Sequence, residues 1–315
     1  MSLGATLSAS LLAVLARPST WPLGLLGFLV RGGWLLVVAP IVVVPTPVGL
    51  ANIVAPLLED VAFGRRTTEL VATGGVVIVA ALVWLIGGGL IAAVAEAEGV
   101  RRIAEEESVA VGAEGGVALG ELAVAWRIVG ARLLAQVPLA IAIAWATVRI
   151  VTLAYRELTV PSDVSVPIAW RIVAGAPDAF VALLLAWLFA EVVGAIAARV
   201  LVFARPGVRE AAGLALGRVR RRPVRMLALG LTTSAVLVIV LGTTGLAAGA
   251  TWNALGAELA IGDPSPVATV LLLLFVGLFV GGLVLIGLAC AWRNAVWTVE
   301  VGGTFGGGGA TRSGD

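Results

Sequence analysis

Two charged residues, Arg31 and Glu191, lie inside long apolar runs, where an ionisable side chain could do chemistry within a membrane. Such a group is unfavourable there by about 2.5–3.5 kcal/mol on insertion scales and is rarely left facing lipid. Counted from the predicted cytoplasmic ends of their runs, Arg31 lies about 13 Å deep and Glu191 about 18 Å deep at the helical rise. Small residues share the helix face of each, which suits contact between helices. We therefore predict that the two side chains pair or share a small polar cavity. The pair would either fix helix register or serve a transport or proton-relay step.

A second set of chemically capable residues is a cluster of arginines within residues 199–225, between two apolar runs. Its densest part contains Arg218, Arg220, Arg221, Arg222 and Arg225. These side chains could contact anionic lipid headgroups, each contributing about 1 kcal/mol near such a surface. The favoured interpretation is a topology anchor without a specific ligand, because positive charge remains in the cytoplasm.

The chain offers little for catalysis. Histidine is absent, which excludes imidazole bases, histidine metal ligands and nucleophiles activated by histidine. One cysteine, Cys290, excludes an intramolecular disulfide. The glycine runs lie within apolar segments and lack the lysine of a phosphate loop. We predict no catalytic residue, no cofactor, no metal site and no enzymatic activity.

Composition places the chain in a bilayer. Hydrophobic residues make up 60% of 315 positions and charged residues 13%, too few polar side chains for a soluble surface. The net charge is only +2, with the arginines gathered near the ends of apolar runs, which argues against a nucleic-acid surface.

Six apolar runs are each long enough to span a membrane. They cover residues 23–44, 70–95, 133–155, 179–203, 226–249 and 267–292. The pattern predicts an all-α integral membrane protein with six transmembrane helices in three repeated hairpins, each preceded by a short interfacial amphipathic helix. The repeats cover residues 8–95, 121–203 and 208–297 of a single transmembrane domain, 1–300. A glycine-rich tail, 301–315, is predicted to be disordered.

Arginine distribution orients the predicted helices. Under this topology fifteen arginines lie on one side and five on the other, with Arg31 inside a span. The positive-inside rule makes the richer side cytoplasmic, so both termini are predicted to be cytoplasmic in a protein of the cytoplasmic membrane.

One segment carries a resemblance. Residues 211–231, AAGLALGRVRRRPVRMLALGL, follow a scheme of interfacial helix, elbow and hairpin. In this the chain resembles uncharacterised six-helix bacterial membrane proteins, including the membrane domain of some glycerophosphodiester phosphodiesterases. The resemblance implies the fold alone. It implies no phosphodiesterase activity, because no catalytic domain is present, and it names no site residue.

Two functional hypotheses remain open. The first is a non-enzymatic multi-pass membrane protein that acts as a partner or scaffold in a membrane complex. Its expected partners are the lipid bilayer, anionic lipid headgroups and another membrane protein. The alternative is a transporter of a small solute, ion or lipid that uses Arg31 and Glu191. A water-filled vestibule reaching Glu191 would favour transport, whereas a closed bundle with a broad apolar face would favour the partner role.

Overall fold

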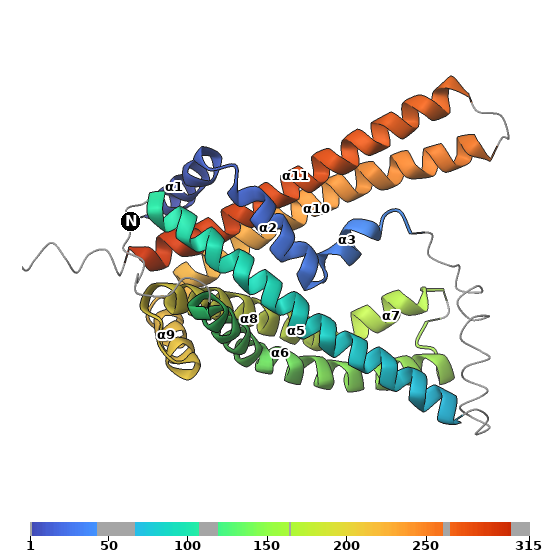
Figure 1. Cartoon of the computed structure of the whole chain (residues 1–315). Coiled ribbons are helices and arrows are strands. Elements are labelled where there is room, and N and C mark those ends of the chain that lie inside the picture. Colours follow the sequence, from blue (N-terminus) through green and yellow to red (C-terminus); the bar gives the residue numbers. More distant parts are fainter. Residues whose placement is uncertain (1, 43–66, 107–118, 164, 261–264, 304–315) are drawn as a thin grey trace, which may run out of the picture. The chain divides into compact units, whose positions relative to one another are not determined.

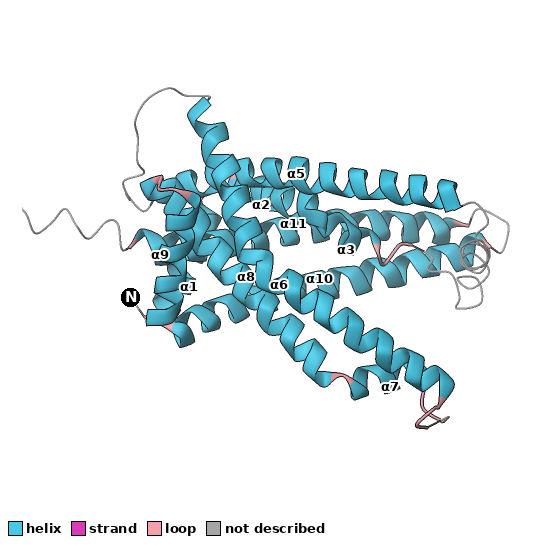
Figure 2. Cartoon of the chain, turned by 90° about the horizontal axis from the view of Figure 1, so that it is seen from below, coloured by secondary structure: helices cyan, strands magenta, loops and turns pink. Residues whose placement is uncertain are grey.

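The computed structural model describes residues 2–42, 67–106, 119–163, 165–260 and 265–303. Within these ranges all regular structure is helical and no strand occurs (Figure 1; Figure 2), so the predicted all-α fold is confirmed. In chain order the elements are α1 (Leu3–Ala16), α2 (Thr20–Phe28), the π-helical turn η1 (Leu29–Gly33), α3 (Trp34–Val38), α5 (Thr67–Glu106), α6 (Leu119–Thr159), α7 (Ile168–Gly175), α8 (Pro177–Ala204), α9 (Val208–Arg221), α10 (Pro223–Leu259) and α11 (Pro266–Gly302).

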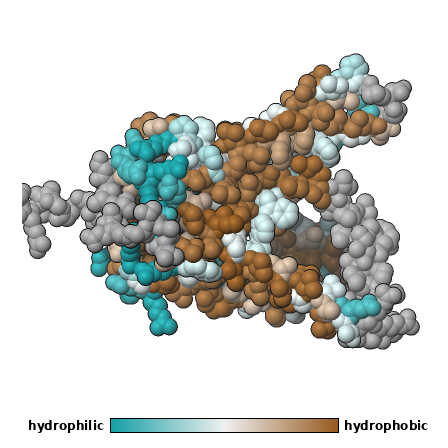
Figure 3. Space-filling model, in the orientation of Figure 1, coloured by the Kyte–Doolittle hydropathy of each residue, from teal (hydrophilic) through white to brown (hydrophobic). Residues whose placement is uncertain are grey.

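Six of the described helical segments are long and apolar enough to cross a membrane. They are Thr20–Val38, Val71–Glu106, Glu121–Thr159, Pro177–Ala204, Pro223–Leu259 and Pro266–Gly302. Each overlaps one of the six predicted runs, so the chain is a multi-pass membrane protein. Hydrophobic side chains cover most of the visible surface of the long helices, as a lipid environment requires (Figure 3).

Five of the six spanning segments are longer than their predicted apolar runs, whereas the first, Thr20–Val38, ends at Val38, before the end of the predicted run 23–44. α6 has 41 residues, with Pro138 inside it. At the helical rise this gives about 60 Å, roughly twice the hydrocarbon thickness of a bilayer. The predicted amphipathic stretch 121–132 is therefore continuous with its span. By contrast, α1 and α9 are separate helices of 14 residues each.

Proline explains where the two separate helices end. α9 stops at Arg221, and Pro223 begins α10. A proline lacks the amide donor that would continue the preceding helix, yet it fits the first turn of the next one. Pro18 similarly stands between α1 and α2. Pro138 interrupts nothing, because prolines are tolerated within transmembrane helices.

The described residues form two compact units, whose boundaries fall between α1 and α2 and within α5, α10 and α11. The first unit contains residues 2–18, 97–235 and 292–303 of the described chain. Its centre is α8, in which every residue from 192 to 203 is buried. α6 and α9 both pack against α8 and against each other. Small residues allow the close packing: Gly194 faces Arg132 and Ala135 of α6.

The second unit contains residues 19–42, 67–96 and 236–291, again counting only the described chain. Leu237, Ile286, Ala289 and Cys290 form its buried cluster. Gly24 of α2 lies so close to α11 that an added Cβ would be 2.6 Å from the Ala291 amide nitrogen. Backbone contact at a glycine therefore sets the spacing of these two helices, and Leu25 and Phe28 of α2 pack against the buried cluster beside it.

Candidate functional site

The two predicted intramembrane charges fall in different units, and each has an ion-pair partner within its own unit. Nη2 of Arg31, in η1, lies 2.6 Å from Oε2 of Glu96 on α5. Oε2 of Glu191, on α8, lies 3.3 Å from Nη2 of Arg293 on α11. The pairing of Arg31 with Glu191 would join the two units, and it stays a prediction.

Neither Glu96 nor Arg293 was singled out from the sequence. Glu96 directly follows the predicted run 70–95, and Arg293 directly follows the predicted run 267–292, so both stand at the polar ends of their runs. The signal that could have found Glu96 is snorkelling, because a long arginine side chain points towards the nearer membrane surface. Its partner is therefore better sought towards that surface than at equal depth.

Arginines also hold the interior of the first unit together. Arg199 of α8 is fully buried. It donates to the Ala195 carbonyl at 3.0 Å and to the side-chain and backbone oxygens of Asn294 on α11 at 3.1 and 3.3 Å. Such bonds are required because a buried guanidinium without acceptors is strongly destabilising.

A second arginine ties three helices at the end of α11. Arg225 of α10 donates from Nε and Nη2 to both carboxylate oxygens of Glu300, at 2.8 and 2.5 Å. Its Nη2 also donates to Oγ1 of Thr6 on α1 at 3.0 Å. The fork geometry of arginine suits this bidentate pairing, which neutralises the Glu300 carboxylate.

A cavity of about 280 Å³ lies beside this pair, at the elbow between α9 and α10. It is lined by Ile196, Arg218, Arg221, Arg222, Met226, Glu300 and Val301. The elbow produces this arrangement: the last turn of α9 and its Arg222 cap carry the three arginines, and α10 turns away at Pro223. The apolar wall comes from α8, α10 and α11.

The cavity is positively charged. Glu300, the one carboxylate in the lining, is already neutralised by Arg225. Within the described part of the chain, Arg221 and Arg222 have no carboxylate partner. Burial lowers the pKa of Arg218, while the nearby Glu300 raises it. A bound anion would favour the charged form of Arg218, as the Glu300 carboxylate does, so the site favours an anionic ligand.

The predicted headgroup contacts divide into three groups. Arg218, Arg221 and Arg222 line the cavity. Arg225 lies next to it but is engaged with Glu300 and Thr6. Arg220 is exposed and is not part of the lining. The helix face on which each arginine lies therefore decides whether it lines the cavity, and only some members of the cluster do.

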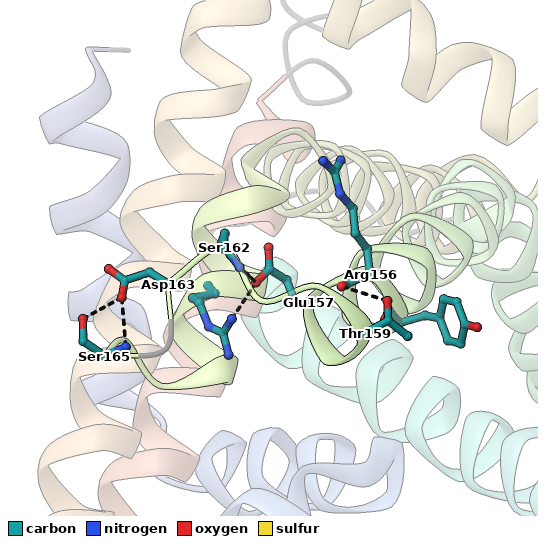
Figure 4. A network of polar contacts seen from close by, with 8 residues as sticks. Arg156, Glu157, Thr159, Ser162, Asp163 and Ser165 are labelled. Carbon is teal, nitrogen blue, oxygen red and sulfur yellow. Dashed lines mark hydrogen bonds and ion pairs between the residues drawn. The ribbon is translucent and has the colours of Figure 1, made fainter.

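A polar network at the other end of α6 is built differently (Figure 4). Oε2 of Glu157 accepts hydrogen bonds from the amide and hydroxyl of Ser162, at 3.0 and 2.9 Å, and from Nη1 of Arg171 on α7, at 2.7 Å. Asp163 accepts from the hydroxyl and amide of Ser165, which lower its pKa. The bonds in this network close the turn between α6 and α7, which makes its role structural.

The sequence predicts that the chain has no metal site. Among the described residues, no three carboxylate or thiol side chains come together in a way that could hold a metal ion. The predicted lack of a metal site, a cofactor and catalytic residues stays a prediction.

Comparison with known proteins adds no family to this picture. No family model matches the chain, and neither a curated protein nor a solved structure was found to match it. What identifies the chain is its six apolar helices, which make it a multi-pass membrane protein.

Proposed function

We propose that this is a non-enzymatic protein of the cytoplasmic membrane that binds the phosphate-bearing headgroup of an anionic lipid at the α9–α10 elbow. The observation that carries the proposal is the cavity lined by Arg218, Arg221 and Arg222, whose one carboxylate is neutralised by Arg225. Guanidinium groups match phosphate oxygens in geometry and charge. Three of them around one volume form a site for that chemistry.

The surroundings of the cavity favour a lipid as the source of the phosphate. Ile196, Met226 and Val301 provide an apolar wall beside the arginines. Leu214 and Leu216 of α9 are about half exposed, so the same helix presents apolar side chains to its surroundings. At about 280 Å³ the cavity lies near the lower limit of small-molecule sites, roughly 300–1,000 Å³, as expected for a headgroup whose chains stay outside.

Headgroup binding is compatible with the scaffold hypothesis, because a lipid-binding protein can also hold a membrane partner. A transporter using Arg31 and Glu191 stays a separate prediction, since the cavity contains neither residue. The resemblance to the membrane domain of some glycerophosphodiester phosphodiesterases also stays a prediction.

Removing cavity arginines is expected to weaken anionic-lipid binding. At about 1 kcal/mol per basic residue, Arg221→Ala with Arg222→Ala should reduce affinity for phosphatidylglycerol roughly 30-fold. Binding is measured by native mass spectrometry of the full chain with added phosphatidylglycerol, and with phosphatidylcholine as the neutral lipid. The matched control is Arg209→Ala with Arg220→Ala, which removes the same charge from exposed positions of α9 outside the lining.

The controls separate this site from general attraction and from a soluble anion. Equal losses in the cavity and control variants would show non-specific surface electrostatics and refute the site. If inorganic phosphate protects the detergent-solubilised protein against heat as well as phosphatidylglycerol does, the ligand is a soluble anion. In that case the lipid assignment is wrong.

Orientation is the second testable part of the proposal. With Cys290 replaced by alanine, single cysteines at exposed Leu158 and Arg221 are treated with a membrane-impermeant thiol reagent in intact cells. Labelling is expected at position 158 and not at 221, because the arginine-rich side stays in the cytoplasm. The reverse pattern would exclude the proposed topology. Three further positions expected from the sequence, Arg65 and Asp263 outside and Thr311 inside, lie outside the described residues.

A further inference from the structure

The first transmembrane segment of the second unit is broken at η1. Gly32 has φ +99° and ψ −1°, inside a π-helical turn between α2 and α3. Side chains other than glycine rarely adopt this φ, so Gly32 permits the break. Breaks and π-turns within transmembrane helices occur frequently at functional sites, and single residues of this kind can act as hinges.

The break is joined to α5 by a partly buried ion pair. Arg31 immediately precedes Gly32, and its guanidinium lies 2.6 Å from Glu96. The Glu96 side chain is 2% exposed, whereas that of Arg31 is 28% exposed. The carboxylate is thus fixed within the unit, and the arginine is the partner that can move towards water.

The charged groups to consider around this pair come from the second unit and from the next turns of α5, where Arg101 and Arg102 pair with Glu98. Among the described residues of the second unit Arg31 is the one basic side chain, and the acidic ones are Glu69, Glu96 and Glu258. Glu69 stands in the first turn of α5, about 40 Å along the helix from Glu96. Glu258 accepts a hydrogen bond from Ser265 beyond the end of α10. The thiol of Cys290 is the other titratable group, and it lies in the apolar cluster.

Backbone packing holds α5 against the N-terminal side of the break. At Gly88 an added Cβ would lie 2.6 Å from the Val30 carbonyl oxygen. On the other side, α3 meets α5 through the edge-on rings of Trp34 and Trp84, whose centroids are 6.4 Å apart. An aromatic edge contact can slide, whereas a glycine contact at this spacing cannot, so movement at Gly32 would displace α3 relative to α5.

We propose that Glu96 is a buried proton-binding site and that the Arg31–Glu96 pair is a latch on the hinge at Gly32. A proton taken up at a carboxylate oxygen of Glu96 makes this group neutral and removes its charge attraction for Arg31. The still-charged arginine then moves towards water, and α3 swings about Gly32. Carboxylates within membrane spans serve as proton relays in this way, and buried ion pairs can bias a two-state element. This inference does not depend on headgroup binding.

Distance measurements between α3 and α5 test the latch. With Cys290 replaced by alanine, spin labels are placed at Leu36 and Val83, which are 59% and 66% exposed. Electron paramagnetic resonance distances are recorded in nanodiscs between about pH 9 and about pH 4, which covers the range of buried and exposed glutamates. A second distance population is expected to grow as the pH falls.

Substitutions distinguish a latch from a structural tie. Glu96→Gln should show the low-pH distances at every pH, and Arg31→Gln should do the same. Glu69→Gln, on the same helix, should retain the pH response of the unsubstituted protein. The proposal fails if Glu96→Gln keeps the high-pH distances, if the pH response persists in that variant, or if the unsubstituted protein shows no response. The last outcome is measured on the protein without charge substitutions, so it can be tested even if the variants do not fold.

Discussion

Alanine in place of Gly24 is expected to lower the free energy of unfolding by about 2 kcal/mol, as overpacking commonly does. The new Cβ would lie 2.6 Å from the Ala291 amide nitrogen and 2.9 Å from the Gly287 carbonyl oxygen. Both atoms belong to the backbone of α11, so no side-chain rotation relieves the clash. The two helices must separate, and the second unit loses their close contact. The measurement is thermal unfolding of the detergent-solubilised full chain.

Gly27 provides the matched control, three residues along the same helix. An added Cβ there meets nothing within 4 Å. Gly27→Ala should therefore be neutral or stabilising by about 0.5 kcal/mol, because alanine has the higher helix propensity. Equal loss in both variants would mean that the contact between α2 and α11 does not set the stability of the second unit.

Replacing Arg225 with methionine is expected to destabilise the protein by about 3 kcal/mol, the lower end for breaking a buried ion pair. The side chain of Glu300 is only 10% exposed and would lose both of its bonds to Arg225. Thr6 would lose its donor from the same guanidinium. Chemical or thermal unfolding of the full chain measures the loss.

Two comparisons make this second result specific. Arg225→Met combined with Glu300→Leu should recover much of the stability, because the double variant has no buried carboxylate left without its arginine. Arg17→Met is the exposed counterpart, because Arg17 pairs with Glu105 and Glu106, whose side chains are 64% and 40% exposed. This variant should lose much less stability than Arg225→Met, since water already solvates its charges. A loss at Arg225 no larger than at Arg17 would show that burial adds nothing to the Glu300 pair.

The sequence predicted the spans well because the bilayer imposes a local rule. About 20 apolar residues are needed to cross, and their hydrogen bonds must be satisfied within the helix. The elbow at Arg222 and Pro223 was equally predictable, since proline acts on its immediate neighbours. The continuity of α6 could not be predicted from the sequence, because amphipathic and spanning residues can belong to one helix without any local break.

Glycine spacing was a poorer guide to helix contact. Gly245 and Gly249, at the four-residue spacing that suits close helix contact, both approach Pro40, with added Cβ atoms at 3.2 and 3.1 Å. Gly277 and Gly281 face open space. Gly287 of α11, outside this spacing, instead lies against α2, with an added Cβ 3.0 Å from the Trp21 carbonyl oxygen. In a chain with 40 glycines many such spacings occur by chance. A spacing motif does not say which face of a helix meets a neighbour.

The sequence by itself determined that the chain is helical, that six segments can cross a membrane and that arginines gather near their ends. Each of these properties depends on residues that are close together in the sequence, because hydropathy, helix length and proline breaks act locally. Tertiary structure alone decided that Arg31 meets Glu96, that Glu300 is neutralised by Arg225, and that three arginines of one cluster surround a cavity while Arg220 does not. These depend on helix rotation and on contacts between residues as distant in sequence as Thr6 and Arg225, which no local pattern encodes.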